Sequence, residues 1–326
     1  MVDRSDCGDG RSTLVSVVMP VFNGERFVEA AIASVLGQTH GHFELVVVDD
    51  GSTDGTGRIL QRLAATDSRI RILAQDNQGV AAARNRALAA CRGQWVANLD
   101  SDDRMLPSRL ERQLAFIDAH PDVKVCACRA CYINPTGRAI GRTKLEPFTS
   151  AAALKRYLAD GGIVGVNHSS VMMHRPTILA LGGYRTRFRS AEDLDLWNRV
   201  VDAGHLLLMQ DEVLSEYRLH EGSMVTASMA DVLMDFEWMK AGILARRAGE
   251  PEPDRETFLA AWRSRPWYQR LWSHLFHLAN RQYRAAGFDV ASGRWLHGAG
   301  RLLVAGLCRP DYVLSRLSSQ LARPSR

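Results

Sequence analysis

The sequence has no apolar run that approaches the roughly 20 residues a helix needs to span a bilayer. Its first 13 residues, MVDRSDCGDGRST, are polar and lack the apolar segment of a signal peptide. On these two absences we expect neither a membrane-spanning helix nor export. We predict a cytoplasmic protein, either free in solution or peripheral at the inner face of the membrane.

Cysteine is scarce, with six residues in 326, which argues against a disulfide framework. Cys126, Cys128 and Cys131 form one cluster. A CxCxxC pattern can bind a metal, but zinc sites normally need a second ligand pair. Because the cluster lies in the β-branched run VKVCACRACYI, we interpret it as part of a strand and expect reduced thiols.

Glycine is missing where a dinucleotide-binding loop needs it. Such a loop requires GxGxxG in the first turn between strand and helix, and this turn offers only Gly24. The glycines of GSTDGTG (51–57) follow the second predicted strand and stand in a different order. We therefore do not expect NAD or FAD binding.

Acidic residues are rare in the last part of the chain. From Phe258 onward there are eleven arginines and no lysine against two acids, Asp289 and Asp311, although the net charge of the whole chain is only +5. With 326 residues and 46% hydrophobic content, the chain can form one large domain and an appendage. The appendage is the basic part.

Short apolar runs alternate with helical patterns over the first 130 residues, which is typical of βαβ units. Val28, Ala31 and Val35 recur at helical spacing, and Pro107 is a favoured first-turn residue for a later helix. The pattern predicts an α/β fold with a mostly parallel twisted sheet and helices on both faces. The predicted strands are residues 14–20, 43–50, 69–73 and 94–100.

Polar side chains follow each of these four strands. Because ligands of such sheets bind beyond the carboxyl ends of the strands, we predict one polar ligand site at this edge. The segments are PVFNGE (20–25), DDGSTD (49–54), QDNQG (75–79) and DSDD (100–103).

The DSDD segment is a candidate metal site. Asp100 and Asp102 flank Ser101, so on an extended segment their carboxylates can point the same way. A Mg²⁺ or Mn²⁺ ion held there would keep ligand positions for phosphate oxygens. The alternative is a solvated acidic loop.

The segment that follows the second strand can also be interpreted in two ways. A carboxylate at a strand end can accept hydrogen bonds from a base N–H or a ribose hydroxyl, and we expect Asp49 to be half buried and Asp50 to be free. The alternative is a tight turn with a helix cap from Ser52, Thr53 or Asp54.

Arg84 falls in the helix after the third strand, from which it could reach a phosphate or a base. The alternative is an arginine whose stem lies along the protein surface. Gly79 begins this helix and would leave its first N–H groups open to an anion.

Glu192 and Asp193 lie in the first turn of a later predicted helix. Ser190 and Asp193 match a capping box, and acids favour helix N-termini in any case. A carboxylate kept ionised by the helix dipole would also serve as a general base. His220 is a lone histidine, which is more often structural than a ligand.

Taken in chain order, these segments resemble the motifs of family 2 glycosyltransferases with the GT-A fold. The likeness covers about residues 14–225 and leaves out the tail. The motifs are VSVVMPVFNGERFVEAAIASVLGQT, ELVVVDDGSTDGT, NQGVAAARNRAL, WVANLDSDD, SSVMMHRPTILALGGY, AEDLDLWNRV and YRLHEGS.

The resemblance implies roles for the matching residues. Phe22 would stack on a uracil-like base whose edge Asp50 bonds, and Asp193 would be the catalytic base. Asp102, with His220, would hold Mn²⁺ or Mg²⁺. The nucleotide and sugar would contact Pro20, Phe22, Asn23, Glu25, Asp49, Asp50, Gly51, Ser52, Asn77, Gly79, Arg84, Asp100, Ser101 and Glu192.

The implied reaction is a metal-assisted single displacement that inverts the anomeric centre. A sugar would move from a nucleoside-diphosphate sugar, with UDP favoured, to a hydroxyl of a glycan or lipid-linked acceptor, in surface polysaccharide or glycan biosynthesis. The QxxRW motif of processive synthases is missing, so a single transfer is expected. The alternatives are an inactive sugar-nucleotide binder and a nucleotidyltransferase, which would normally carry a glycine-rich phosphate loop after the first strand.

We expect three parts: a flexible N-terminus (1–13), the GT-A domain (14–230) and a basic helical region (231–326). In the last region Leu271, Leu275 and Leu278 recur on one face. One interpretation is a membrane-surface helix that meets anionic headgroups. The other is an appendage packed on the catalytic domain or on a second subunit in a homo-oligomer. No nucleic-acid partner is expected.

Overall fold

A computed structural model describes residues 13–143, 146, 148–220, 229–291 and 293–321. The chain divides into two compact units. The first unit comprises Met1–Tyr132 and Arg142–Arg218, and the second comprises Ile133–Gly141 and Leu219–Arg326.

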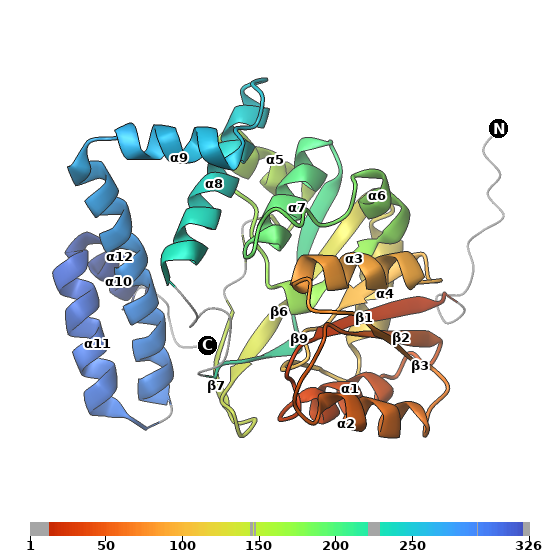
Figure 1. Cartoon of the computed structure of the whole chain (residues 1–326). Coiled ribbons are helices and arrows are strands. Elements are labelled where there is room, and N and C mark those ends of the chain that lie inside the picture. Colours follow the sequence, from red (N-terminus) through yellow and green to blue (C-terminus); the bar gives the residue numbers. More distant parts are fainter. Residues whose placement is uncertain (1–12, 144–145, 147, 221–228, 292, 322–326) are drawn as a thin grey trace. The chain divides into compact units, whose positions relative to one another are not determined.

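The first unit begins with the predicted parallel strands. Their register aligns Val21 with Asp49 and Asp49 with Ala74, so the carboxyl ends of three neighbouring strands meet at one edge of the sheet. The strands are β1 (Val15–Val21), β2 (Phe43–Asp49), β3 (Ile70–Ala74) and β4 (Trp95–Asn98), in the order β3-β2-β1-β4. Figure 1 labels the first three of them.

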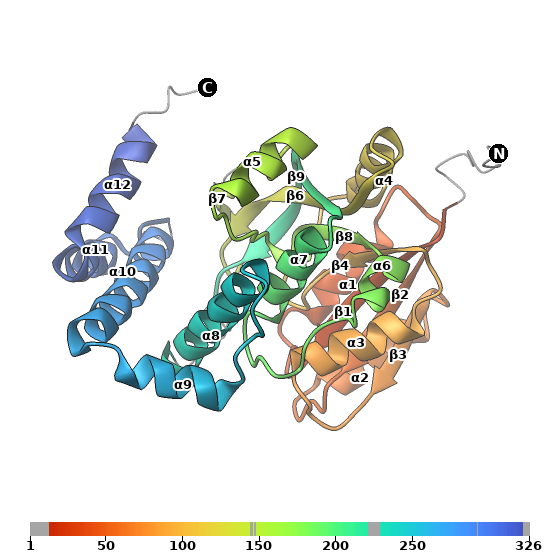
Figure 2. The ribbon, with the colours of Figure 1, turned by 90° about the horizontal axis from the view of Figure 1, so that it is seen from above.

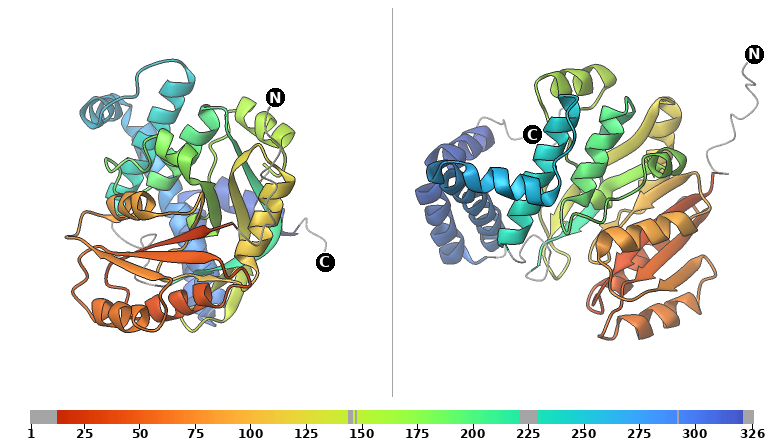
Figure 3. Two further views of the ribbon diagram at one scale, coloured as in Figure 1. Left: turned by 90° about the vertical axis from the view of Figure 1, so that its right-hand side faces the viewer. Right: turned by 45° about the horizontal axis from the view of Figure 1, so that its top comes forward.

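Helices cover both faces of this parallel half, as predicted. Helix α3 lies on one face, and α1 and α2 lie on the other (Figures 1 and 3). In α1 the buried residues Val28, Ala31, Ile32 and Val35 are those whose spacing predicted the helix. The bounds are α1 (Val28–Leu36), α2 (Thr56–Ala64) and α3 (Val80–Ala90).

Beyond β4 the sheet becomes antiparallel, so the fold is a mixed sheet and less parallel than predicted. The order continues from β4 through β8, β6 and β9 to β5, and β7 pairs with β6. The pairs β4–β8, β8–β6 and β9–β5 are antiparallel. The strands are β5 (Arg104–Met105), β6 (Val123–Ile133), β7 (Ala139–Arg142), β8 (Val171–His174) and β9 (Leu206–Arg218).

Further helices complete the first unit. They are α4 (Arg109–Ala119), α5 (Ala151–Ala159), α6 (Arg175–Ala180) and α7 (Glu192–Asp202), with a 3₁₀ turn, η1, over His168–Ser170. The strand prediction for the cysteine cluster is confirmed, since Cys126 and Cys128 lie buried in β6. Burial raises the pKa of both thiols, and the described cysteines are free.

The second unit is mainly helical, as predicted. Helices α10 and α11 are joined at Gly293, whose φ of 82° favours glycine, and they pack along each other beside α12 (Figure 2). None of the described helices is long and apolar enough to cross a membrane. The helices are α8 (Met229–Arg247), α9 (Arg255–Ser264), α10 (Trp267–Ala291), α11 (Trp295–Cys308) and α12 (Pro310–Leu321).

Candidate active site

The loops after β1 and β2 are hydrogen-bonded to each other. The Asn23 N–H donates to Ser52 Oγ at 2.9 Å, and the Thr53 N–H donates to Asn23 Oδ1 at 2.8 Å. The Gly55 N–H donates to Glu25 Oε2 at 2.7 Å. Three predicted ligand contacts, Asn23, Glu25 and Ser52, therefore also join the two loops that form the frame of the site. Phe22 projects from this frame and is 50% exposed.

Asp50 is buried and bound within the protein, so the expectation that it is free is wrong. Its Oδ1 accepts from Gln75 Nε2 at 2.7 Å and from the Gln78 N–H at 2.9 Å, while Oδ2 accepts from the Gly79 N–H at 2.9 Å. The loop before α3 folds back onto the end of β2. The Asp50 carboxylate is thus the anion bound by the free N–H group of Gly79 at the start of α3. Asp49 is half buried, as expected, and accepts from the Ser52 N–H at 2.9 Å.

Gly51 is required where this loop meets the end of β2. Its φ is 79°, and a Cβ there would lie 2.8 Å from the backbone nitrogen of Asn77. Any larger residue would push the β3–α3 loop away from Asp50. Pro20 is buried within β1, in register with Val48 of β2, so it belongs to the sheet and not to the loop that follows.

Arg84 lies at the centre of the site, and the alternative of a surface arginine is wrong. Only 3% of the residue is exposed. Its Nη2 donates to Asp100 Oδ1 at 2.8 Å, and its Nη1 forms a short ion pair with Glu192 Oε1. One guanidinium therefore joins the DSDD segment after β4 to the first turn of α7, two segments that lie 92 positions apart in the sequence.

The charges around Arg84 shift the pKa values of its neighbours. For Asp100, burial opposes ionisation, but Arg84 and further hydrogen bonds outweigh it and hold the pKa below its usual range. For Glu192, burial outweighs Arg84 and raises the pKa to about 7. Burial also raises the pKa of Asp193, with the charge of Asp100 adding to the effect. The pKa of Arg84 is raised as well, since its acidic neighbours outweigh its burial.

The pKa shifts of Arg84 and Glu192 favour different protonation states of their ion pair. The raised pKa of Arg84 favours the charged pair, whereas the raised pKa of Glu192 favours its neutral form. Arg84 stays protonated because Asp100 compensates its charge, so Glu192 is the partner that can carry a proton near neutral pH.

Helix α7 begins differently from the prediction. Its N-cap is Ala191, in the left-handed region at φ 67°, and no side chain caps the helix, so the predicted capping box of Ser190 and Asp193 is wrong. Asp193 Oδ1 instead accepts from the N–H of Leu194. The first turn still carries Glu192, Asp193 and Asp195, where the helix dipole favours negative charge.

Sequence reasoning missed His168 and Tyr184 as members of the site. Both are buried, and His168 Nε2 lies 2.8 Å from the Tyr184 hydroxyl. His168 Nδ1 faces Asp100 Oδ1 at 3.8 Å, and its ring stacks on Trp197. Burial and then Arg84 lower the pKa of His168 far below its usual range, so the ring is neutral. The signal for both residues lay at the ends of the motif SSVMMHRPTILALGGY, since His168 directly precedes it and Tyr184 is its last residue.

The third aspartate of DSDD is structural. Asp103 is buried, and its Oδ1 accepts from the Arg218 N–H at 2.7 Å. Arg218 Nε donates to the backbone oxygen of Asp102 at 2.7 Å. Burial and then the charge of Asp102 raise the pKa of Asp103 well above its usual range. These bonds fix the turn that carries Asp102, whose side chain is half buried.

The fit of a divalent cation can be judged from the carboxylates of this turn. Within the described residues, no group of three or more His, Cys, Asp and Glu side chains could hold a metal by itself. Asp100 is ionised and Asp102 sits on the same turn, which suits an ion that takes one or two carboxylates and completes its shell with substrate phosphates. His220 belongs to the second unit, so its predicted role stays a prediction.

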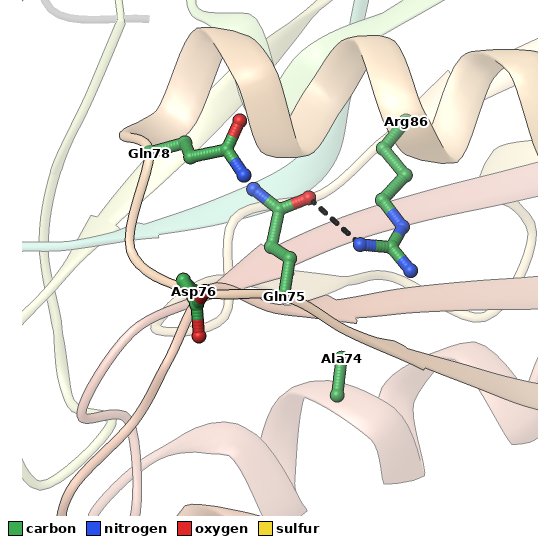
Figure 4. Close-up of a pocket in the computed structure, with 5 residues that line it drawn as sticks. All are labelled: Ala74, Gln75, Asp76, Gln78 and Arg86. Atoms are coloured by element: carbon green, nitrogen blue, oxygen red, sulfur yellow. Dashed lines mark hydrogen bonds between the residues drawn. The ribbon is translucent and has the colours of Figure 1, made fainter.

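A pocket of about 470 Å³ opens beside the β3–α3 loop. Its lining residues are Ala74, Gln75, Asp76, Gln78 and Arg86 (Figure 4). Arg86 contacts Gln75 Oε1 at 3.5 Å, and the amide of the same glutamine donates to Asp50. The pocket therefore borders the strand-end site on its β3 side and lies apart from the acids that surround Arg84.

The site thus combines hydrogen-bonded loops at the carboxyl ends of β1 and β2 with a cluster of acids around the buried Arg84. The sequence profile described as "Glycosyl transferase family 2" matches residues 16–217. The chain belongs to this family and is a glycosyltransferase with a GT-A fold.

Individual relatives agree with this assignment. Over 216 residues the chain is 34% identical to a Bacillus subtilis (strain 168) protein named "Putative teichuronic acid biosynthesis glycosyltransferase TuaG", which covers 64% of this chain and 81% of the relative.

Two solved structures share the fold. The first is S. aureus TarS 1-349 with UDP-GlcNAc, which has a TM-score of 0.57 and 17% identity and covers 88% of this chain and 90% of that one. The second is the mannosyltransferase PcManGT from Pyrobaculum calidifontis with GDP-Man and Mn²⁺. Its TM-score is 0.54 and its sequence identity is 17%, and the match covers 97% of this chain and 82% of PcManGT.

Proposed function

We propose that this protein is an inverting glycosyltransferase that moves a sugar from a UDP-sugar to a hydroxyl acceptor in one displacement. The observation that carries the proposal is the double contact of Arg84 with Asp100 and Glu192. It brings the DSDD segment, proposed to face the diphosphate, next to α7, which presents the proposed base. A leaving group and a base are needed on opposite sides of the same anomeric carbon.

Asp193 is the proposed general base. It is half buried in the first turn of α7, and burial raises its pKa while the charge of Asp100 adds to the shift. A carboxylate with a raised pKa is a stronger base than an exposed one. Asp193 would take the proton of the acceptor hydroxyl as its oxygen forms a bond to C1 and the bond from C1 to the diphosphate breaks.

Phe22 and Asp50 are proposed to bind the base of the nucleotide. Phe22 is exposed beside the sheet edge, as a stacking platform must be. Asp50 Oδ2 accepts a hydrogen bond from the Gly79 N–H, and a carboxylate oxygen can accept two. A base N–H could therefore bind Asp50 without displacing the β3–α3 loop. We expect the loop to be ordered by Asp50 before the nucleotide arrives.

Asp102, with Asp100 beside it, is proposed to hold Mn²⁺ or Mg²⁺ against the diphosphate. Such an ion, when bound, supplies positive charge that offsets the charge developing on the leaving group. The chain's own contribution is to keep Asp100 ionised through Arg84 and to fix the Asp102 turn through Arg218.

The donor and the acceptor are proposed from the similar proteins. The TarS structure contains UDP-GlcNAc and the PcManGT structure contains GDP-Man. We propose UDP because the sequence motifs imply a uracil-like base against Phe22 and Asp50. TuaG is named for teichuronic acid biosynthesis, which supports a glycan or lipid-linked acceptor in surface polysaccharide synthesis.

Calorimetry with UDP, GDP and dTDP, each with and without Mn²⁺, tests the donor side. We expect UDP to bind more tightly than the other two and its affinity to rise with the metal. Tighter binding of GDP would contradict the donor assignment.

Proton NMR of the product formed from an α-linked donor tests the mechanism, because inversion requires a β-linked product. An α-linked product would mean retention and would overturn the single displacement.

A further inference from the structure

Helix α11 of the second unit exposes its large apolar residues and buries its small ones. Leu296, Leu303 and Leu307 are 88%, 65% and 77% exposed, whereas Gly298 and Ala305 are buried. This arrangement is the reverse of an ordinary amphipathic helix, whose leucines face the protein core.

The small residues of α11 are needed where it meets α10. A Cβ at Gly298 would lie 2.5 Å from Val290 Cγ2 and 3.1 Å from the backbone oxygen of Ala286. The two helices therefore approach too closely for a leucine at the contact. Ala305 packs in the same way near Ala279 in the core of this unit. The leucines cannot turn inward without separating the helices.

The exposed apolar residues of α11 form one uncharged stripe. Leu296, Gly300, Leu303 and Leu307 recur at positions i, i+4, i+7 and i+11, which lie on one side of a helix. The stripe is about 17 Å long at the rise of an α-helix. Val304 extends it sideways and is also exposed. No residue of the stripe can form a side-chain hydrogen bond with a partner.

Two half-exposed arginines accompany the stripe. Arg294 precedes α11 and Arg301 lies within it, whereas Arg309, which follows α11, pairs with Asp311 and is only 13% exposed. Arg294 and Arg301 share one buried acid, Asp289, and remain about half exposed themselves. The sequence after Phe258 has eleven arginines against two acids, so this region keeps a large positive excess after its ion pairs are formed.

We propose that the stripe of Leu296, Gly300, Leu303, Val304 and Leu307 docks on an anionic lipid surface. Apolar side chains insert between headgroups without needing a complementary partner, while the arginines meet the lipid phosphates. Trp295, exposed next to Leu296, places an indole where tryptophan is favoured at a membrane–water boundary. A second copy of this surface would bring the same positive charge, which disfavours self-association through it.

The proposal goes beyond the transfer reaction and is tested without measuring activity. The full-length protein is sedimented with vesicles of phosphatidylcholine alone or mixed with phosphatidylglycerol. We expect binding to the anionic vesicles only, weakening as salt is raised. The double variant Leu303→Glu/Leu307→Glu should lower the bound fraction about tenfold or more, because each new charge would have to enter the lipid boundary.

Leu179→Glu, compared with the single variant Leu307→Glu, is the matched control, since it places one glutamate on an exposed leucine of the first unit. It should bind vesicles as the unchanged protein does. Circular dichroism and UDP affinity, unchanged in all variants, check that the fold is kept. The proposal is overturned if the unchanged protein ignores anionic vesicles, or if the double variant binds them equally well. A third outcome also overturns it: the unchanged protein does not bind vesicles, and light scattering shows that it is a dimer which the double variant dissociates.

Discussion

The first unit and the α10–α12 part of the second unit use the same residue types in opposite ways. In the first unit, leucines such as Leu45 and Leu60 are fully buried in one large core. In α10–α12 the buried core consists of Ala279, Ala305, Tyr312 and Val313, and the leucines of α11 are outside. The first unit therefore buries its leucines in its own core, whereas α11 leaves its leucines on the surface.

The charges of the two regions differ in the same way. In the first unit the Arg84 guanidinium is almost wholly buried between Asp100 and Glu192. In the second unit Arg294 and Arg301 surround Asp289 with 45% and 43% of their side chains exposed. Buried charges couple to one another strongly, while exposed charges act mainly on an approaching partner. Chemistry is therefore expected in the first region and recognition in the second.

The largest expected effect is on turnover in the first unit. Asp193→Asn removes the proposed base, and we predict a fall in kcat of about 10²- to 10⁴-fold with nucleotide affinity unchanged. Asp202→Asn, at the other end of α7, is the control and should leave kcat nearly unaltered. Steady-state kinetics with calorimetry measures both. An Asp193→Asn variant with normal kcat would remove this residue from the mechanism.

Breaking the buried charge cluster should cost stability. Arg84→Gln leaves Asp100 and Glu192 without their cation, and we predict a loss of about 3 to 5 kcal/mol in the free energy of unfolding. Arg86→Gln changes an exposed arginine of the same helix and should cost less than about 0.5 kcal/mol. Urea unfolding measures the difference. Equal losses for the two variants would mean that the Arg84 cluster is not buried as described.

One substitution made in both regions tests the contrast in packing. Leu45→Ala removes a fully buried side chain of β2 and should cost about 2 to 5 kcal/mol. Leu307→Ala removes an exposed side chain of α11 and should change the free energy of unfolding by less than about 0.5 kcal/mol. Thermal and urea unfolding of the two variants provide the comparison. A large loss for Leu307→Ala would show that α11 is covered in solution.

The smallest expected effect is a shift in pH dependence. Turnover needs Asp193 ionised, so kcat should fall as pH is lowered through the raised pKa of this carboxyl. Glu192 carries a proton below its raised pKa of about 7. Glu192→Gln keeps this side chain neutral, so the acid limb of the profile should stay where it is. A pH–rate profile of both proteins checks this, and a shift of the acid limb in the variant would show that Glu192 is charged beside Asp193.

Much of the fold could be predicted from the sequence because its signals are local. The β-branched runs of β1 and β2 and the spacing of Val28, Ala31 and Val35 on α1 each lie within one element. The location of the site could also be predicted, because the carboxyl ends of parallel strands lie at the same edge of the sheet. The antiparallel half of the sheet could not be predicted in the same way, since its pairing joins strands that are distant in the sequence.

The contacts within the site were harder to predict. Arg84 lies in a helix rich in alanine with no clear polar face, so its burial depends on Asp100 and Glu192 arriving from other elements. Asp50 was expected to be free because nothing in its own turn binds it; its donors come from the loop before α3. At α7 the capping box failed because Ala191 adopts a left-handed conformation that no side-chain pattern signalled.

A crystal structure with an intact UDP-sugar analogue and Mn²⁺ would test the central claim most directly. We predict the diphosphate and the ion against Asp102, the base on Phe22, and the Asp193 carboxylate across the anomeric carbon from the leaving group. A nucleotide bound only in the pocket of Gln75, Gln78 and Arg86, or a sugar that Asp193 cannot reach, would contradict the proposed site.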